Sequence, residues 1–384
     1  MTPVELSSTV VRAVRRAVDD GELVVAVPER AQVVPPGPGG RGDYATNVAL
    51  QLARPAGRPP KEVAEILRPH LSGVAGVARV DITGPGFLNI TLKGREAALV
   101  AEILRRRERY GYVDGPTGQV VQLRYPCSEV RAAVTGQVLA RILRSRGVLV
   151  RTTCTTCTTC TACTARTAGA VSASCEAAEV VEAAEDALDP AWARTLGVTV
   201  EAAQGPPEAP APTSAPLEVD LLPVPAGQDP TPLGRDAGRW ALLHPAAHDH
   251  PRITDEHLVQ RESNPLFRVR YAYARAKALG RNAAALGFAA VPGDHVSVPG
   301  PLLDALDAYP HALAAAARHR APDRVARHLV TVADALLAFQ HTVLPLGDEK
   351  PSAAHRSRLA LAEAAGTVLA GGLSLLGIDA PTHL

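Results

Sequence analysis

The sequence predicts an α+β N-terminal domain, a short α/β middle part and an all-α C-terminal helical bundle. Helix and strand patterns alternate along residues 1–115, which is typical of an α+β domain. A strand and a helix open residues 116–255, which then lose their periodicity in a Thr/Cys repeat and a proline-rich stretch. Residues 256–384 show helical periodicity alone, as in a bundle.

The chain has no strong overall charge, because 40 basic residues face 39 acidic ones. Any nucleic-acid surface must therefore be a local concentration of basic side chains. Near the N-terminus, Arg12, Arg15 and Arg16 interrupt any apolar core of a signal peptide. No run of about 18 apolar residues is evident that would span a bilayer. We therefore expect a cytoplasmic protein that does not bind a membrane.

Apolar spacing predicts the elements of the N-terminal domain. Val10 and Val14 lie on one face of a first helix, which ends at Gly21. Short strands follow at 24–27 and 32–34, helices begin near 48 and 61, and two strands follow at 78–82 and 87–92.

The strand at 87–92 alternates between two kinds of side chain. Leu88, Ile90 and Leu92 share an aliphatic face that suits a core, whereas Phe87 and Asn89 lie on the opposite face. An aromatic ring can stack on an unpaired base while an amide bonds the edge of that base, so this pair is a candidate RNA contact. An edge aromatic beside a turn-stabilising asparagine is the structural alternative.

The N-terminal motifs also resemble a known family. Segments 42–47 (Gly-Asp-Tyr-Ala-Thr-Asn), 57–60 (Gly-Arg-Pro-Pro) and 84–90 (Gly-Pro-Gly-Phe-Leu-Asn-Ile) resemble, in order and spacing, the N-terminal additional domain of arginyl-tRNA synthetases. In that family this domain meets the D-arm of tRNA, which implies the same role for Phe87 and Asn89.

The middle part opens with a strand at 120–123 and a helix at 134–143, which resemble the start of a class I synthetase catalytic domain. The family places a His-x-Gly-His signature at the intervening turn and a Lys-Met-Ser-Lys signature later. Here the turn reads Ser-Glu-Val-Arg over 128–131, no histidine lies between His70 and His244, and no lysine lies between Lys93 and Lys277. We expect a truncated α/β remnant with no catalytic residues; Arg131 is the basic residue of the turn that could substitute for the missing charge.

A Thr/Cys repeat follows, with cysteines at three-residue intervals: Cys154, Cys157, Cys160 and Cys163. This spacing also occurs in metal and iron–sulfur sites, but the neighbours here are nearly all Thr and Ala. A low-complexity repeat or a local frameshift is the favoured interpretation, and we expect no metal. A proline-rich linker covers 205–232, before a segment at 234–243 that resembles the Gly-x-Asp-Ala-x-Arg-x-x-Leu-Leu helix closing the family's catalytic core.

The C-terminal part begins with a basic helix. Asn264 suits an N-cap and Pro265 the first helical position. No acidic residue lies between 264 and 281, where five cations occur: Arg268, Arg270, Arg275, Lys277 and Arg281. Cations seven residues apart fall on one side of a helix, so they suit a phosphate backbone, and Tyr271 adds an aromatic ring between them. A solvated helix surface is the alternative.

Further helices are expected at 302–308 and, after a turn at 309–310, through Leu313, then from Pro322 and over 356–376. The Asn-Pro-x-x-x-x-x-Tyr-Ala-x-Ala-Arg pattern at 264–275 and the tail at 358–378 resemble the anticodon-binding domain of arginyl-tRNA synthetases.

These resemblances imply an arginyl-tRNA synthetase-related anticodon-binding protein that binds tRNA or a tRNA-like RNA, has lost aminoacylation and needs no cofactor. The enzyme alternative is a residual arginine–tRNA ligase, which would use ATP and Mg²⁺. The third alternative is a protein-interaction module whose bundle binds a protein partner.

Overall fold

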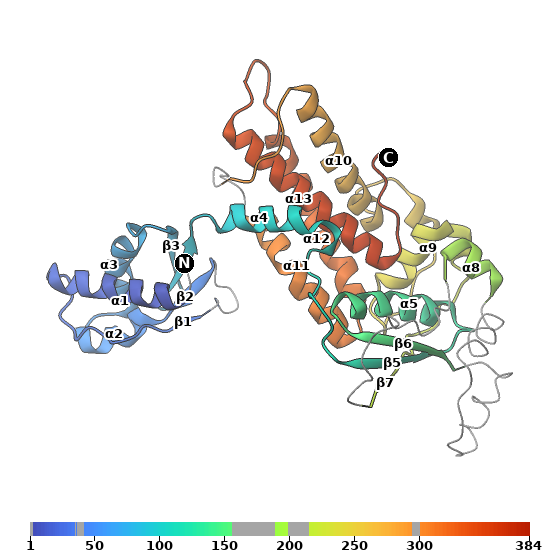
Figure 1. Cartoon of the computed structure of the whole chain (residues 1–384), viewed down its shortest axis with the longest axis horizontal. Helices are drawn as coiled ribbons and strands as arrows, with labels where there is room; N and C mark the ends of the chain where they lie inside the picture. Colours follow the sequence, from blue (N-terminus) through green and yellow to red (C-terminus); the bar gives the residue numbers. More distant parts are fainter. Residues whose placement is uncertain (1–2, 35, 37–41, 156–188, 199–214, 294–299) are drawn as a thin grey trace. The chain divides into compact units, whose positions relative to one another are not determined.

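The computed structural model describes residues 3–34, 36, 42–155, 189–198, 215–293 and 300–384 (Figure 1). Its contacts divide the chain into two compact units, Met1–Ala98 and Leu99–Leu384. Each unit has a hydrophobic core of its own.

The N-terminal unit combines an antiparallel sheet with helices, in agreement with the expected α+β content. Its described elements in chain order are α1 (Pro3–Asp19), β1 (Val33–Val34), β2 (Tyr44–Thr46), α2 (Val48–Ala56), α3 (Pro60–Ser72), β3 (Val77–Thr83) and β4 (Phe87–Leu92). The strands lie in the order β1-β2-β4-β3, and each neighbouring pair is antiparallel. The aliphatic face of β4 is in the core, because Leu88 and Ile90 are fully buried.

The strand expected at 24–27 is wrong. These residues form no strand, and Val24 is 86% exposed. A strand requires a neighbouring strand for its backbone hydrogen bonds. Here the chain leaves α1 through a turn in which Ala17 O accepts from the amides of Glu22 and Leu23, and the next backbone pairing begins at β1.

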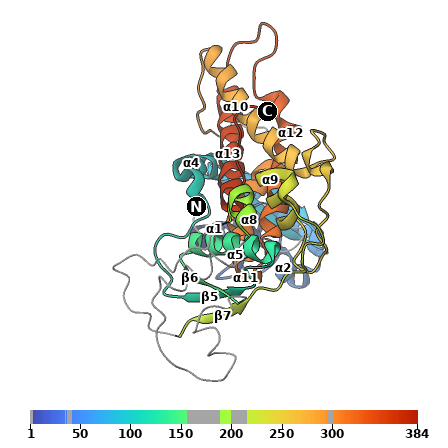
Figure 2. The same ribbon diagram turned by 90° about the vertical axis from the view of Figure 1, so that its right-hand side faces the viewer.

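The second unit opens with the later turns of α4 (Arg95–Arg106) and with the 3-10 helix η1 (Arg107–Arg109). A small parallel sheet with its helices follows: β5 (Val120–Tyr125), α5 (Val130–Ser145), β6 (Leu149–Cys154), α8 (Pro190–Leu196), β7 (Leu217–Asp220) and α9 (Gly234–Leu243). The strand order is β6-β5-β7, with both pairs parallel. Helix α5 connects β5 to β6 and packs along the sheet, as the strand–helix pattern predicts (Figures 1 and 2).

The C-terminal part of this unit is helical, as expected. Its long helices are α10 (Pro265–Ala285), α11 (Gly300–His319), α12 (Asp323–Phe339) and α13 (Ala353–Leu376). Helices α10, α12 and α13 pack against one another (Figures 1 and 2). The predicted stripe of α12 is buried, since Val325, Leu329 and Leu336 have no exposed surface.

Helix α11 corrects the turn expected at Tyr309-Pro310, because it runs unbroken through Pro310. A proline inside a helix has no N–H for the carbonyl four residues earlier, here Leu306 O. The structure supplies another donor, since the Tyr110 hydroxyl donates to Leu306 O over 3.2 Å. The Tyr110 ring also stacks on Tyr309, with the ring centroids 6.1 Å apart.

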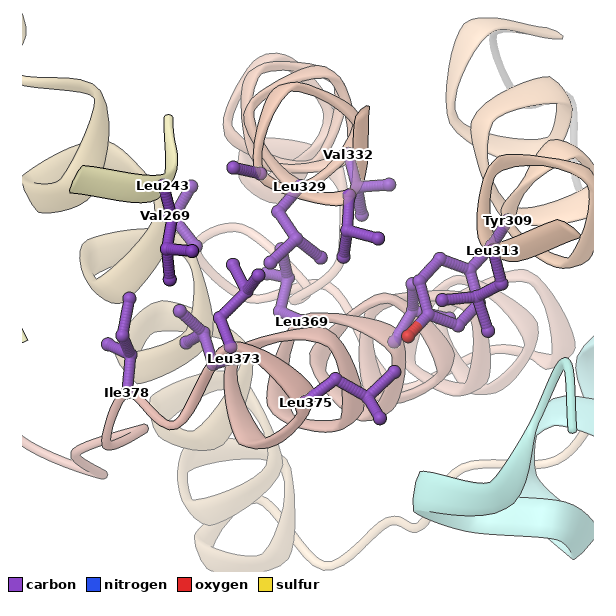
Figure 3. Close-up of a cluster of buried hydrophobic side chains, with 14 of the residues drawn as sticks. Leu243, Val269, Tyr309, Leu313, Leu329, Val332, Leu369, Leu373, Leu375 and Ile378 are labelled. Atoms are coloured by element: carbon purple, nitrogen blue, oxygen red, sulfur yellow. The ribbon is translucent and has the colours of Figure 1, made fainter. Parts of the chain in front are cut away.

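The middle and C-terminal parts share one core, whose cluster runs from Val100 to Ile378 (Figure 3). Its members include Leu243 of α9, Val269 of α10, Leu329 of α12 and Leu369 of α13. The predicted boundary at 255/256 is therefore not a boundary between two cores. The predicted N-terminal domain also ran to residue 115, whereas the compact N-terminal unit ends at Ala98.

Helix α13 is the central helix of the shared core. It is long and apolar enough to cross a membrane by length and composition, a property that our sequence reading missed, but 78% of its most apolar window is buried inside the molecule. Its two consecutive glycines allow close packing. A Cβ on Gly371 would lie 3.0 Å from Glu108 O, and one on Gly372 would lie 2.4 Å from the side chain of Leu329.

Candidate nucleic-acid interface

The basic helix α10 begins as predicted. The side-chain oxygen of Asn264 accepts from the backbone amides of Leu266 (3.0 Å) and Phe267 (3.4 Å). Its amide nitrogen donates to the carbonyls of His257 and Val259, each at 2.9 Å. Asn264 therefore caps the helix and also fixes the preceding loop against it.

The five cations of α10 form two groups on the helix surface. Arg270, Lys277 and Arg281, spaced by seven and four residues, share one side. Arg268 and Arg275, seven residues apart, share another. Between the two groups lie Phe267 and the 36% exposed Tyr271, whose rings stack at a centroid distance of 5.6 Å.

Residues from other elements neutralise or hold three of these cations. Arg268 donates to Asp334 of α12 over 2.8 Å, and Arg270 lies 3.5 Å from the carboxylate of Asp236 on α9. Arg275 donates to the side chain of Gln340 over 2.8 Å.

We missed these partners because Asp236, Asp334 and Gln340 are distant in sequence and share no motif with α10. The structure therefore assigns Arg268, Arg270 and Arg275 a packing role that the sequence pattern did not predict.

Lys277 and Arg281 are the exposed cations of α10. The Lys277 ammonium lies over the ring of Tyr273, 5.3 Å from its centroid. Arg281 forms no hydrogen bond or ion pair with any residue that the structure describes. Of the predicted contacts on α10, these two cations and Tyr271 are the most accessible to a ligand.

The N-terminal candidates Phe87 and Asn89 differ in exposure. Phe87 is 39% exposed at the start of β4, so its ring is accessible. Asn89 is 1% exposed, and its amide donates to the Thr83 hydroxyl over 2.7 Å. This corrects the expectation that the ring and the amide lie side by side on an open face. Asn89 instead joins β4 to the end of β3 across the turn that precedes Phe87.

The turn between β5 and α5, where the family's histidine signature is expected, is occupied by the Glu129 side chain. Its carboxylate accepts from the amides of Arg131 (3.2 Å), Ala132 (2.7 Å) and Ala226 (3.3 Å). The first two are free amides of the α5 N-terminus, which would otherwise attract a phosphate. A carboxylate at this position disfavours a second anion.

Arg131, the candidate substitute for the missing charge, is buried. It is 1% exposed and donates to five backbone carbonyls, those of Leu242, Val224, Asp249, Pro245 and Ala246, at 2.7–3.2 Å. Burial lowers the pKa of its guanidinium. The side chain connects α5 to the segment after α9, so it does not face a ligand.

Within the described part of the chain, no group of three or more His, Cys, Asp or Glu side chains could hold a metal ion. Cys154 is buried at the end of β6 and forms no disulfide with a residue that the structure describes. Cys157, Cys160 and Cys163 lie outside the described residues, so the metal interpretation of the repeat is not tested.

Comparisons with protein families match both ends of the chain. The arginyl tRNA synthetase N terminal domain matches residues 5–92, and the DALR anticodon binding domain matches residues 269–384.

Comparisons with individual proteins cover more of the chain than these two domain matches. The arginine–tRNA ligase of Renibacterium salmoninarum is 29% identical in an alignment that covers all of both chains. That alignment has 550 positions and this chain has 384 residues, so at least 166 positions face gaps in this chain. The arginine–tRNA ligase of Frankia alni is 44% identical over 160 residues, which are 39% of this chain and 29% of the relative.

A solved structure gives the same fold relationship. This chain aligns with the structure of the arginyl-tRNA synthetase of Thermus thermophilus over the whole length of both chains. The TM-score is 0.50 and the sequence identity is 16%. At that identity the likeness concerns the fold: mixed α/β content with a helical C-terminal domain.

Proposed function

Because this chain belongs to the arginyl-tRNA synthetase family, we propose that it binds tRNA through its C-terminal helical domain. The observation that supports this proposal most directly is the match of the anticodon-binding domain to the bundle that contains α10. On that helix Lys277 and Arg281 are exposed, and the exposed Tyr271 ring stacks on Phe267 nearer the start of the helix. Cations suit phosphates, and exposed rings suit unpaired bases.

The N-terminal unit is the proposed second contact. Phe87 would stack on a base, and Asn89 would act indirectly by holding the end of β3 and the turn before Phe87. Arg268, Arg270 and Arg275 would position α10, and Arg275, whose partner Gln340 is neutral, would add to its positive field.

We further infer that residues 116–255 are a shortened form of the class I catalytic domain that no longer aminoacylates tRNA. The parallel sheet and α5 resemble the start of such a domain, and the gaps in the full-length alignment agree with a loss of length. Glu129 and Arg131 support the loss of adenylation, because one fills the α5 N-terminus with negative charge and the other faces backbone carbonyls.

A residual arginine–tRNA ligase is the second candidate, and the comparisons favour it over the loss of activity. The full-length relatives are named as arginine–tRNA ligases and align with all of this chain. This candidate needs ATP and Mg²⁺ at a site rebuilt without the histidine and lysine signatures.

Arginine-dependent ATP–pyrophosphate exchange, measured with and without tRNA, separates these two candidates. We expect no exchange above a protein-free control, and tRNA binding at low salt in the same preparation. Measurable exchange would establish the ligase and refute the loss of activity. A failure to bind any tRNA at low salt would refute tRNA binding itself.

A protein partner remains the third alternative, and accessible residues test it best. Lys277→Ala and Arg281→Ala should each weaken tRNA binding and lower the slope of log Kd against log salt by about 0.7–0.9. Arg324→Ala is the matched control, because this arginine is exposed on α12. If both test variants bind RNA as the unaltered chain does but fail to replace it in cells, a protein partner is favoured.

Cytoplasmic localisation is part of the proposal, and fractionation of cells tests it.

A further inference from the structure

A groove runs along one face of α13 in the second unit. Two adjoining cavities form it, of about 690 and 530 Å³, and they share Glu108, Tyr273 and Ala370 in their linings. From α13 the lining includes Glu363, Gly366, Thr367, Ala370 and Ser374. Steps of three and four residues place these on one side of the helix. At 1.5 Å per residue, 363–374 spans about 16 Å.

The groove is basic although the chain as a whole is nearly neutral. Among the described residues, six cations from four different elements line it: Arg107 of η1, Arg141 and Arg144 of α5, Arg235 of α9, and Lys277 and Arg281 of α10. Three acids oppose them: Glu108, Glu363 and Asp379. The two-to-one excess contrasts with the 40 to 39 balance of the whole sequence.

Two of the acids have a cation of the groove as a neighbour. Asp379 lies 3.7 Å from Arg235, so these two largely neutralise each other. Burial raises the pKa of the Glu363 carboxyl, with Lys277 opposing the shift. Three further cations line the second cavity, Arg107, Lys277 and Arg281, and all three are exposed. Tyr273 lines both cavities.

Arg107 has an unusual backbone conformation in this groove. It is an exposed, non-glycine residue with a φ of 53°, in the left-handed region that costs free energy for such residues. The backbone is held there because the Tyr110 amide donates to Arg107 O over 3.0 Å and because η1 packs closely on α13 at Gly371. Strained residues concentrate at functional sites, so Arg107 is the residue to test.

We propose that this groove binds the sugar–phosphate backbone of an RNA strand. The inference rests on the proposed tRNA binding and deepens it, because four of the six cations lie outside α10. Each nucleotide of the strand adds one negatively charged phosphate, so a groove of this length would contact several successive phosphates. An RNA strand that contacts α10 would then run along α13 towards the end of α5. The cations that it meets outside α10 belong to no motif that the sequence analysis identified.

The test uses two arginines in the same backbone conformation. Arg107→Gly removes a groove cation and relieves the positive φ. Arg320→Gly is the matched control, because Arg320 is also exposed, has a φ of 56° and lies outside the groove. Glycine tolerates this conformation, so both variants should remain folded. Arg235→Gln, whose side chain is 47% exposed, is the second groove variant.

Binding of the full-length chain to unfractionated tRNA is measured by filter retention over a range of salt concentrations. We expect Arg107→Gly to weaken tRNA binding several-fold and to lower the slope of log Kd against log salt by about 0.7–0.9. Arg235→Gln should also weaken binding and lower this slope. Arg320→Gly should bind tRNA as the unaltered chain does. If both groove variants bind as the unaltered chain does, the groove proposal is overturned while tRNA binding stands. If the unaltered chain binds no tRNA, both proposals fail.

Discussion

At the scale of single residues, Arg131 shows how a side chain's role depends on its partners. By type and position it was a candidate to replace the missing charge beside ATP. In the folded chain it donates to five backbone carbonyls and is only 1% exposed, so it does not meet a phosphate. Asn89 is a similar case, because its amide bonds Thr83 rather than facing solvent. Both side chains therefore stabilise the fold around them and do not face a ligand.

Asn264 provides the first prediction. Asn264→Ala removes the acceptor for two helix amides and the donor for two loop carbonyls. We expect the free energy of unfolding to fall by about 1–2 kcal/mol, measured by urea denaturation. Asn282→Ala is the control, because Asn282 is exposed near the end of the same helix. Equal effects of the two substitutions would contradict the capping role.

His328 provides a pH-dependent prediction. Burial lowers the pKa of its imidazole below the ordinary value of 6.5, and the Ala305 carbonyl opposes the shift. The unfolded chain therefore binds a proton more readily, so stability is present above pH 6.5 and is lost as the pH falls through the lowered pKa. In His328→Gln, the free energy of unfolding should therefore fall less steeply between pH 7 and about 5.

Thermal unfolding at several pH values measures this effect. His311→Gln, an exposed histidine on α11, is the control. Burial also lowers the pKa of His244, so part of the acid-side loss should remain in His328→Gln. A profile as steep as that of the unaltered chain would contradict the prediction.

At the scale of elements, close contacts decide how the helices of the bundle pack. Helix α13 meets η1 at Gly371 and α12 at Gly372, where a Cβ would collide with neighbouring atoms. Helix α11 passes through Pro310 because Tyr110 supplies the missing donor to Leu306 O. Neither arrangement follows from helix propensity, which disfavours glycine and proline inside helices.

Two glycine substitutions test this packing. Gly372→Ala should lower the free energy of unfolding by about 1–3 kcal/mol, because its Cβ would lie 2.4 Å from the Leu329 side chain. Gly280→Ala on α10 should be neutral or stabilising by up to about 1 kcal/mol, because its Cβ meets a single atom, of Glu363, at 3.5 Å. Chemical denaturation of both variants checks the contrast, and a stabilised Gly372→Ala would refute the close contact.

At the scale of the whole molecule, the part of the chain that the structure describes contains two hydrophobic cores. One core lies within Met1–Ala98, and the other joins the parallel sheet to the C-terminal helices. The buried Arg239 is one of the links in this second core, because it donates to Leu376 of α13, to Leu196 of α8 and to Gln137 of α5. Burial lowers the pKa of Arg239 to about 9, so these bonds offset a real desolvation cost.

Two cores predict two unfolding transitions in scanning calorimetry. Leu67→Ala, in the N-terminal core, should lower the midpoint of one transition and leave the other unchanged. Leu329→Ala, in the second core, should do the reverse. Each substitution should cost its own unit about 2–5 kcal/mol. A single transition that both variants shift equally would show that the units unfold together.

Much of the fold could be predicted from the sequence. The N-cap at Asn264, the strand at 87–92, the strand–helix opening of the middle part and the stripe of α12 all depend on neighbours within a few residues. The candidate site was less predictable. The basic character of α10 was evident, but its partners Asp236, Asp334 and Gln340 were not, because they reach α10 only through tertiary packing.

By itself the sequence determined most of the helices and strands, the family that both ends resemble, and the absence of the two signature motifs. These follow from local periodicity, capping and short motifs. Only the tertiary structure decided which cations remain exposed, that Asn89 and Arg131 are buried, and that cations from η1, α5, α9 and α10 meet along α13. The physical reason is that burial and charge pairing depend on atoms that are close in space and far apart along the chain.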